Sequence, residues 1–284
     1  MCRIFSFRSI IQSSIHNSLI VAKNALVDQS KKHPDGWGIA YYKLGRPYIV
    51  KNCESAFNDK KFNEVSQHLS SETFLAHIRR ATQGEHSNVN THPFKHLNWT
   101  FCHNGHIANF PEVKKDIMSK ISPSLLSNIK GSTDSEVLFY WILESMKNNF
   151  DLASKNISMA DLSESVKTSI SYLINRYGNI GNENDFNKDY LNYYSFVLSN
   201  GEVILSFCLG NSLYYSTHKH KCPESDSCPF YAKECVEKSV EGYVKHMLIS
   251  SEPIGGENIW VKMKKGDITG IDHNFKVFFD SIDF

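Results

Sequence analysis

The chain has 284 residues, enough to bury a sizeable core in one large domain or two small ones. Its 31 lysines and arginines nearly balance its 30 acidic residues, so no broad positive field favours nucleic acid or anionic lipid as a partner. No run approaches the roughly 18 apolar residues of a membrane span and no secretory signal is visible, so we expect a cytoplasmic protein without membrane or nucleic-acid partners.

The first third of the chain is predicted to be rich in strands. Residues 3–7 alternate as a strand does, and apolar residues then recur at helical spacing, which predicts a helix over 16–30. The stretch 37–51 reads as two strands around a turn at Leu44-Gly45-Arg46. Two further strands are expected at 73–78 and 99–104, joined by a long polar connection.

Helices follow, and then strands return. Thr133 and Glu136 have the spacing of a capping box, so a helix is expected to begin at about Thr133, and a second one to cover 159–176. A hairpin with Asn200-Gly201 at its turn comes next. The last predicted strands are 245–250, 258–263 and 274–279. This order predicts a single α+β domain over 2–284, with two antiparallel sheets covered by helices.

Cysteine follows the initiator methionine directly. Cys2 has a side chain small enough for the methionine to be trimmed, which would leave a thiol and a free amine on one residue. The ordinary pKa is about 8.5 for a thiol and about 8 for an α-amine, so the amine can accept the thiol proton near neutral pH. The other six cysteines are widely spread, and we expect reduced thiols. Cys2 is therefore the candidate nucleophile.

Six short motifs gain specificity from occurring together: "MC", "HPDGWGIA" (33–40), "AHIRRATQG" (76–84), "NTHPF" (90–94), "FCHNGHIAN" (101–109) and "GSTDSE" (131–136). In this order they resemble the class II glutamine amidotransferases, the N-terminal-cysteine branch of the N-terminal nucleophile hydrolases. The pattern is similar to that of small standalone members, including γ-glutamyl amide hydrolases. The resemblance is strong over 2–145 and weaker beyond. It implies a four-layer αββα sandwich and no cofactor.

The resemblance also implies roles for the residues of these motifs. Asn104 and Gly105 would form the oxyanion hole, the first through its side-chain amide and the second through a backbone N–H that no Cβ obstructs. An isolated Asn-Gly pair can also be a simple turn, but the accompanying motifs favour the oxyanion hole. Arg79 would bind the α-carboxylate of the substrate and Asp134 its α-ammonium. For Asp134, stabilisation of the helix dipole is the structural alternative.

Three further positions are assigned with less support from the motifs. Thr82 would assist in holding the carboxylate, whereas Gln83 stands where other members have histidine, so a second carboxylate contact there is in doubt. His92 and Trp37 are expected to line the pocket wall, although both lie in turn-forming sequences that they could simply shape.

A rival site lies near the C-terminus. It contains five side chains of types that bind zinc: His218, His220, Cys222, Cys228 and Cys235. Their spacing lacks a close cysteine pair, which favours a surface loop over a metal site.

We therefore expect an amidohydrolase that cleaves the γ-amide of glutamine or of a γ-glutamyl compound through a thioester on Cys2. One alternative is a glutaminase subunit that supplies ammonia to a separate synthase partner. Another is a catalytically silent regulator that binds glutamine or zinc. The sequence leaves open which leaving group is released and whether the protein forms a homo-oligomer.

Overall fold

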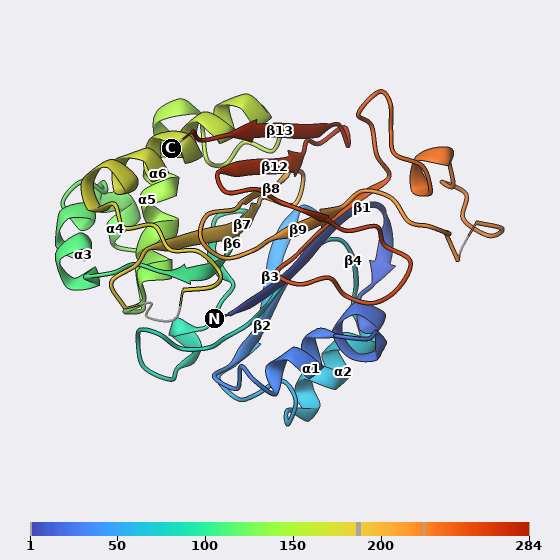
Figure 1. Cartoon of the computed structure of the whole chain (residues 1–284), viewed down its shortest axis with the longest axis horizontal. Coiled ribbons are helices and arrows are strands. Elements are labelled where there is room, and N and C mark those ends of the chain that lie inside the picture. The colour runs from blue at the N-terminus through green and yellow to red at the C-terminus, as the bar shows by residue number, and fades with distance from the viewer. Residues whose placement is uncertain (1, 186–188, 224, 284) are drawn as a thin grey trace.

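A computed structural model describes residues 2–185, 189–223 and 225–283 of the chain (Figure 1). Its centre consists of two antiparallel sheets, one of seven strands and one of six. The seven-stranded sheet has the order β11 (Val261–Lys262), β9 (Tyr214–Ser216), β10 (His246–Ser250), β1 (Arg3–Ser14), β4 (Ser70–Ile78), β2 (Trp37–Lys43), β3 (Arg46–Asn52). The six-stranded sheet has the order β13 (Val277–Ser281), β12 (Asp267–Ile271), β8 (Ile204–Phe207), β7 (Tyr193–Ser199), β6 (Trp99–His106), β5 (Phe94–His96).

Helices cover the outer face of each sheet (Figure 1). The seven-stranded sheet carries a π-helical turn (Asn17–Val21), α1 (Leu26–Ser30) and α2 (Lys60–His68). The six-stranded sheet carries α3 (Phe110–Met118), α4 (Pro123–Leu126), α5 (Asp134–Asn149) and α6 (Met159–Tyr177). Two single turns, Asn88–Asn90 and Lys233–Cys235, complete the helical elements of the described residues. The predicted four-layer αββα sandwich is confirmed.

Strand alternation divides the core into three parts. Ile4 of β1 and Cys102 of β6 belong to an apolar cluster between the two sheets. Phe5 and Phe7, on the opposite face of β1, pack with residues of the helices α1 and α2. Because successive side chains of a strand point to opposite faces, Cys2 lies on the same face as Ile4. The strand geometry therefore directs the candidate nucleophile into the space between the sheets.

Local sequence signals placed several elements correctly. Leu44 and Gly45 both have positive φ, 53° and 71°, and join β2 to β3 in the predicted tight hairpin. Thr133 caps α5, since its hydroxyl accepts the backbone N–H of Glu136 at 3.2 Å. The Glu136 carboxylate accepts the N–H groups of Lys130 and Gly131. The Thr133 half of the capping box is formed, while Glu136 holds the loop before the helix.

The continuous helix expected over 16–30 was wrong. The chain is extended at Ala22 and Ala25, and Asn24 between them has a φ of 61°. The carbonyl of Lys23 accepts the N–H of Gly255 at 2.7 Å, so a contact with a distant segment replaces a helical hydrogen bond. The apolar residues that suggested the helix, such as Leu19 and Leu26, are nevertheless buried. Their spacing therefore indicated burial but not helical continuity.

Candidate active site

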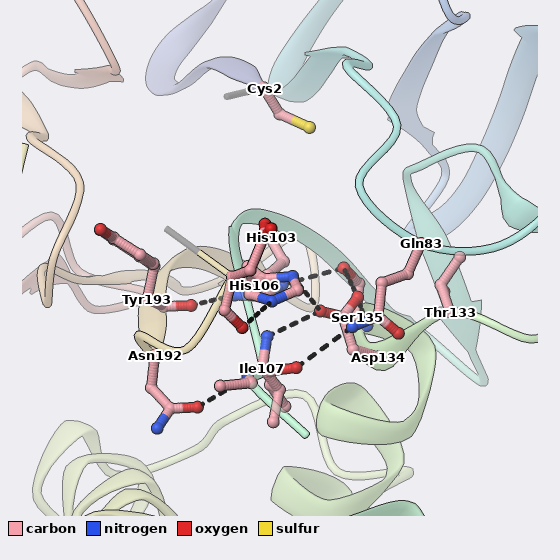
Figure 2. Close-up of polar contacts among 12 residues, drawn as sticks. Cys2, Gln83, His103, His106, Ile107, Thr133, Asp134, Ser135, Asn192 and Tyr193 are labelled. Carbon is pink, nitrogen blue, oxygen red and sulfur yellow. Dashed lines mark hydrogen bonds and ion pairs between the residues drawn. The ribbon is translucent and has the colours of Figure 1, made fainter. Parts of the chain in front are cut away.

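Cys2 lies immediately before β1 and beside the end of β4. Pairing of Arg3 with Ile78 brings Cys2 next to the backbone of Arg80. The Cys2 Sγ accepts the N–H of Arg80 at 3.3 Å and donates to its carbonyl at 3.4 Å. In Figure 2 the thiol projects toward the residues at the end of β6 and the start of α5. The N-terminal strand thus presents a buried thiol to the polar groups of the opposite sheet.

Burial raises the pKa of the Cys2 thiol, and the Asp134 carboxylate acts in the same direction. The Arg80 N–H and the positive charge of Arg79 lower the pKa instead, because both stabilise a thiolate. Each of these groups must lie close enough to Cys2 to interact with it. Cys2, Arg79 and Asp134, which are distant in sequence, therefore lie within electrostatic range of one another.

Arg79 is buried, whereas Arg80 is exposed. The Nη2 of Arg79 donates to the carbonyls of Gln83 at 2.9 Å and Gly84 at 3.2 Å, and Nη1 donates to that of Glu85 at 3.3 Å. These contacts account for three of the five N–H donors of a guanidinium. Arg79 therefore holds the following loop around itself and has donor capacity for a carboxylate.

That loop carries two more of the residues considered from sequence. Thr82 is exposed within it. The side chain of Gln83 donates to the carbonyl of Ile107 at 3.1 Å, so it connects the loop to the end of β6 (Figure 2). Gln83 thus has a structural contact of its own, while Thr82 is accessible from solvent.

Asn104 and Gly105 lie near the end of β6. Asn104 is buried, and its Nδ2 donates to the Ser251 hydroxyl at 3.3 Å. Its carbonyl accepts the Nδ2 of Asn211 at 2.7 Å. A Cβ on Gly105 would lie 1.9 Å from the His103 Nε2 and 2.0 Å from the Tyr193 carbonyl oxygen. This position accordingly requires glycine, because the backbone is closely packed against β7.

Asp134 is the first residue of α5 and is buried. Its Oδ2 accepts the N–H of Ile107 at 2.8 Å, and its Oδ1 accepts the N–H of Ser135 at 2.8 Å. The His106 Nδ1 lies 3.9 Å from Oδ2. The carboxylate is therefore fixed at the positive end of the helix dipole, beside the strand that carries Asn104.

His103 was not identified from the sequence, although it directly precedes Asn104 in the motif. Its Nε2 lies 2.9 Å from the Tyr193 carbonyl, and its Nδ1 lies 2.9 Å from the Ser135 hydroxyl (Figure 2). Because a carbonyl only accepts, Nε2 must carry a proton. Burial lowers the pKa of His103, which favours the neutral ring with its proton on Nε2. The Ser135 hydroxyl that contacts Nδ1 also lies 3.2 Å from Oδ1 of Asp134, to which it can donate. His103 thereby connects β6, β7 and α5 behind the site.

His92 and Trp37 occupy different surroundings. His92 is buried, and its ring lies over His77 with the centroids 4.1 Å apart. Trp37 is fully buried in the cluster on the helix-covered face, where its indole N–H donates to the Asp59 carboxylate at 2.8 Å. This is the face of the sheet opposite to that of Cys2. The structure thus brings together Cys2, Arg79 and Asp134 but places Trp37 in the outer core.

The cysteine-rich segment lies away from this cluster. Cys222, Cys228 and Cys235 line a cavity of about 380 Å³ together with Phe5 and Phe7, on the outer face of β1. Within the described ranges, no three His, Cys, Asp or Glu side chains are arranged to hold a metal ion. None of the described helices is long and apolar enough to cross a membrane.

Comparison with known proteins finds glutamine amidotransferases. The sequence model of the class II glutamine amidotransferases matches residues 1–274. A Haemophilus influenzae protein named "Putative glutamine amidotransferase" is 28% identical over 258 residues, which are 86% of this chain and 76% of that protein. The Saccharomyces cerevisiae protein named "Probable glutamine amidotransferase DUG3" is 30% identical over 163 residues, which are 51% of this chain but only 46% of its own length.

A solved structure shows the same fold. The glutamine aminotransferase class-II domain protein from Silicibacter pomeroyi superposes with a TM-score of 0.64 at 18% identity, covering 100% of both chains. At this identity the superposition is evidence for the fold alone. The family match extends over nearly the whole chain and includes every motif that supplies the buried polar cluster. The chain belongs to the class II glutamine amidotransferases.

Proposed function

We propose that this chain is an amidohydrolase that cleaves the γ-amide of glutamine or of a γ-glutamyl compound, with Cys2 as the nucleophile. The observation that carries the proposal is the position of the Cys2 thiol, which is buried between the sheets, hydrogen-bonded to the Arg80 backbone and within electrostatic reach of both Arg79 and Asp134. A thiol, a cation and an anion in this proximity suit a substrate that carries both a carboxylate and an ammonium group.

The reaction would proceed in two steps. The Cys2 thiolate attacks the γ-carbonyl carbon, and the resulting oxyanion accepts hydrogen bonds from the Asn104 Nδ2 and the Gly105 N–H. The C–N bond then breaks, and the amine takes a proton and departs, leaving a glutamyl thioester. Water attacks the thioester, which releases glutamate and restores the thiol. The α-amine of Cys2 serves as the base, so the mechanism requires removal of Met1, which lies outside the described residues.

Recognition would depend on the two charged side chains. Arg79 binds the α-carboxylate and Asp134 the α-ammonium. These two contacts fix the α-carbon of the substrate, so the length of its side chain determines whether the scissile amide reaches Cys2. Asparagine is one methylene shorter and would hold its amide away from Cys2, a misplacement that can cost about 10²-fold in rate. The leaving amine is not held by this pair, so γ-glutamyl amides with different leaving groups should all be cleaved.

The test is release of ammonia or amine from glutamine, a γ-glutamyl amide and asparagine at matched concentrations. We expect cleavage of the first two compounds and little of asparagine. Cys2→Ala should abolish the reaction, whereas Cys228→Ala, at a partly buried cysteine on the outer face of β1, should retain it. Equal rates with asparagine, or an active Cys2→Ala variant, would refute the proposal. Hydrolysis by the purified chain alone would show that the hydrolytic step itself requires no synthase partner.

A further inference from the structure

Ser251 directly follows β10 and is buried beside the start of β1. Its backbone N–H donates to the Ile4 carbonyl at 2.9 Å, and its hydroxyl oxygen accepts the Ile4 N–H at 3.0 Å. Ile4 is two residues from Cys2. Ser251 therefore holds both backbone groups of Ile4 and fixes the strand that presents the nucleophile.

The same hydroxyl also contacts the opposite sheet. Its oxygen accepts the Asn104 Nδ2 at 3.3 Å, a contact between residues that are 147 positions apart. A hydroxyl oxygen has two lone pairs, so it can accept from Ile4 and Asn104 together. One atom thus connects the Cys2 strand with the residue proposed to stabilise the oxyanion.

The orientation of the Asn104 amide depends on this contact. Its Nδ2 has two hydrogens, of which one is directed to Ser251 and the other is available to a substrate. Its Oδ1 has no hydrogen-bond partner among the described residues. If the amide were rotated by half a turn, Oδ1 would take the place of Nδ2, and no N–H would face the oxyanion.

We propose that Ser251 is a positioning residue for amide hydrolysis, whose hydroxyl orients the Asn104 amide relative to Cys2. The inference rests on the proposed function, since it assumes that Asn104 stabilises the oxyanion. Ser251 itself touches neither the thiol nor the reacting carbonyl. Its effect should therefore appear in kcat rather than in the affinity for substrate.

The experiment compares Ser251→Ala, Ser251→Thr and Ser250→Ala by steady-state hydrolysis of glutamine. Ser250 is a matched control, because it is adjacent and fully buried and also contacts Ile4: its hydroxyl lies 3.4 Å from the Ile4 carbonyl and donates to the Glu252 carbonyl at 2.6 Å, whereas that of Ser251 contacts the Asn104 amide. We expect Ser251→Ala to lower kcat about tenfold, less than loss of the donor itself, with KM changed less than twofold. Ser251→Thr retains the hydroxyl and should keep most of the activity, and Ser250→Ala should stay within twofold of the wild type.

A double mutant distinguishes positioning from a general structural role. If Ser251 acts through Asn104, then Asn104→Ala/Ser251→Ala should be no slower than Asn104→Ala alone. Isotope labelling of asparagine gives a readout besides activity: the Asn104 side-chain NH₂ resonance should shift in Ser251→Ala and not in Ser250→Ala. If Ser251→Ala does not fold, Ser251→Cys, whose sulfur is a weak acceptor, replaces it with the same expectation.

The outcomes are separable. An active wild type together with an unimpaired Ser251→Ala, or with losses that multiply in the double mutant, overturns the role of Ser251 alone. A wild type that neither hydrolyses glutamine nor is labelled at Cys2 by a glutamine-like electrophile overturns the proposed function, and the inference with it.

Discussion

The backbone N–H of Ile107 donates a hydrogen bond of 2.8 Å to Oδ2 of Asp134. It ties the end of the strand that carries Asn104 to the start of α5. Since Oδ1 accepts the N–H of Ser135 at 2.8 Å, each carboxylate oxygen has its own backbone donor. The carboxylate is therefore oriented before any substrate arrives, which suits a residue that binds the α-ammonium group of a substrate.

We predict that Asp134→Asn raises KM for glutamine roughly 10- to 100-fold, the usual worth of one charge-assisted hydrogen bond. The variant loses the charge and can offer an acceptor to only one of the two N–H groups. N-acetylglutamine, which has no ammonium, should be a poor substrate for the wild type. Ammonia release from both compounds is the measurement, with Asp161→Asn in the first turn of α6 as the control. Comparable wild-type rates on the two compounds would show that Asp134 does not bind an ammonium.

A second prediction concerns selectivity among the seven cysteines. A glutamine-like electrophile should label Cys2 alone, since only this thiol adjoins the proposed binding residues. Burial raises the pKa of Cys208 to about 11 and that of Cys102 well above its ordinary value, so both should be inert. Intact mass and peptide mapping should show one adduct on a chain that starts at Cys2. Labelling of Cys222 or Cys228, or quantitative retention of Met1 in active protein, would contradict the assignment.

Elements with local signals could be predicted from the sequence. The hairpin at Leu44-Gly45 and the cap at Thr133 depend on residues within a few positions of one another, and both were placed correctly. The helix α3 was missed, although Pro111 stands at its first turn, a usual helix-start signal. The helix expected over 16–30 failed because Gly255, distant in sequence, takes the carbonyl of Lys23.

The residues of the candidate site also differ in whether a local sequence signal identifies them. Cys2, Arg79 and Asp134 could be named because each lies in a short motif. Ser251 could not be assigned a role, since its contacts with Ile4 and Asn104 arise only when the ends of β10, β1 and β6 meet. Residues that position others through tertiary contacts leave no periodicity or spacing in the sequence.

Stability should depend on pH through His77, a fully buried residue whose ring nitrogen Nε2 lies 3.2 Å from the His103 carbonyl. Burial lowers the pKa of His77 to about 3, whereas an unfolded histidine titrates near 6.5. Between these values the unfolded chain binds a proton that the folded chain does not. The contribution of His77 to the free energy of unfolding is therefore constant above about pH 6.5 and falls by about 1.4 kcal/mol per pH unit below it, until the folded group also titrates; His33 and His246, whose pKa values burial also lowers to about 3, act in the same direction.

Urea unfolding at several pH values between 7 and 5 tests this dependence. His77→Gln should reduce the slope by up to about 1.4 kcal/mol per pH unit relative to the wild type, because one neutral buried histidine is removed. His68→Gln, at an exposed position on α2, should leave the slope unchanged. An equal slope in the wild type and His77→Gln would mean that other groups cause the acid sensitivity.

The last prediction concerns Gly105, whose N–H is the second proposed oxyanion donor. A Cβ at this position would lie 2.0 Å from the Tyr193 carbonyl oxygen of the neighbouring strand and 1.9 Å from the ring nitrogen Nε2 of His103. The carbonyl belongs to the backbone and the ring is held on both sides, so neither can give way cheaply. Gly105→Ala should therefore force β6 away from β7 and destabilise the fold by about 3 kcal/mol or more, the upper range of an overpacked core.

Gly242→Ala is the matched comparison, because a Cβ there meets no atom within 4 Å although its φ is 81°. It should cost about 1 kcal/mol from backbone strain alone. Urea unfolding measures both free energies, and turnover is then compared under conditions in which each variant is folded. We expect folded Gly105→Ala to lose roughly 10²-fold or more in kcat, since displacement of β6 moves the N–H from the oxyanion. A Gly105→Ala variant as stable and as active as Gly242→Ala would show that this backbone segment is not packed as described and that its N–H does not stabilise the transition state.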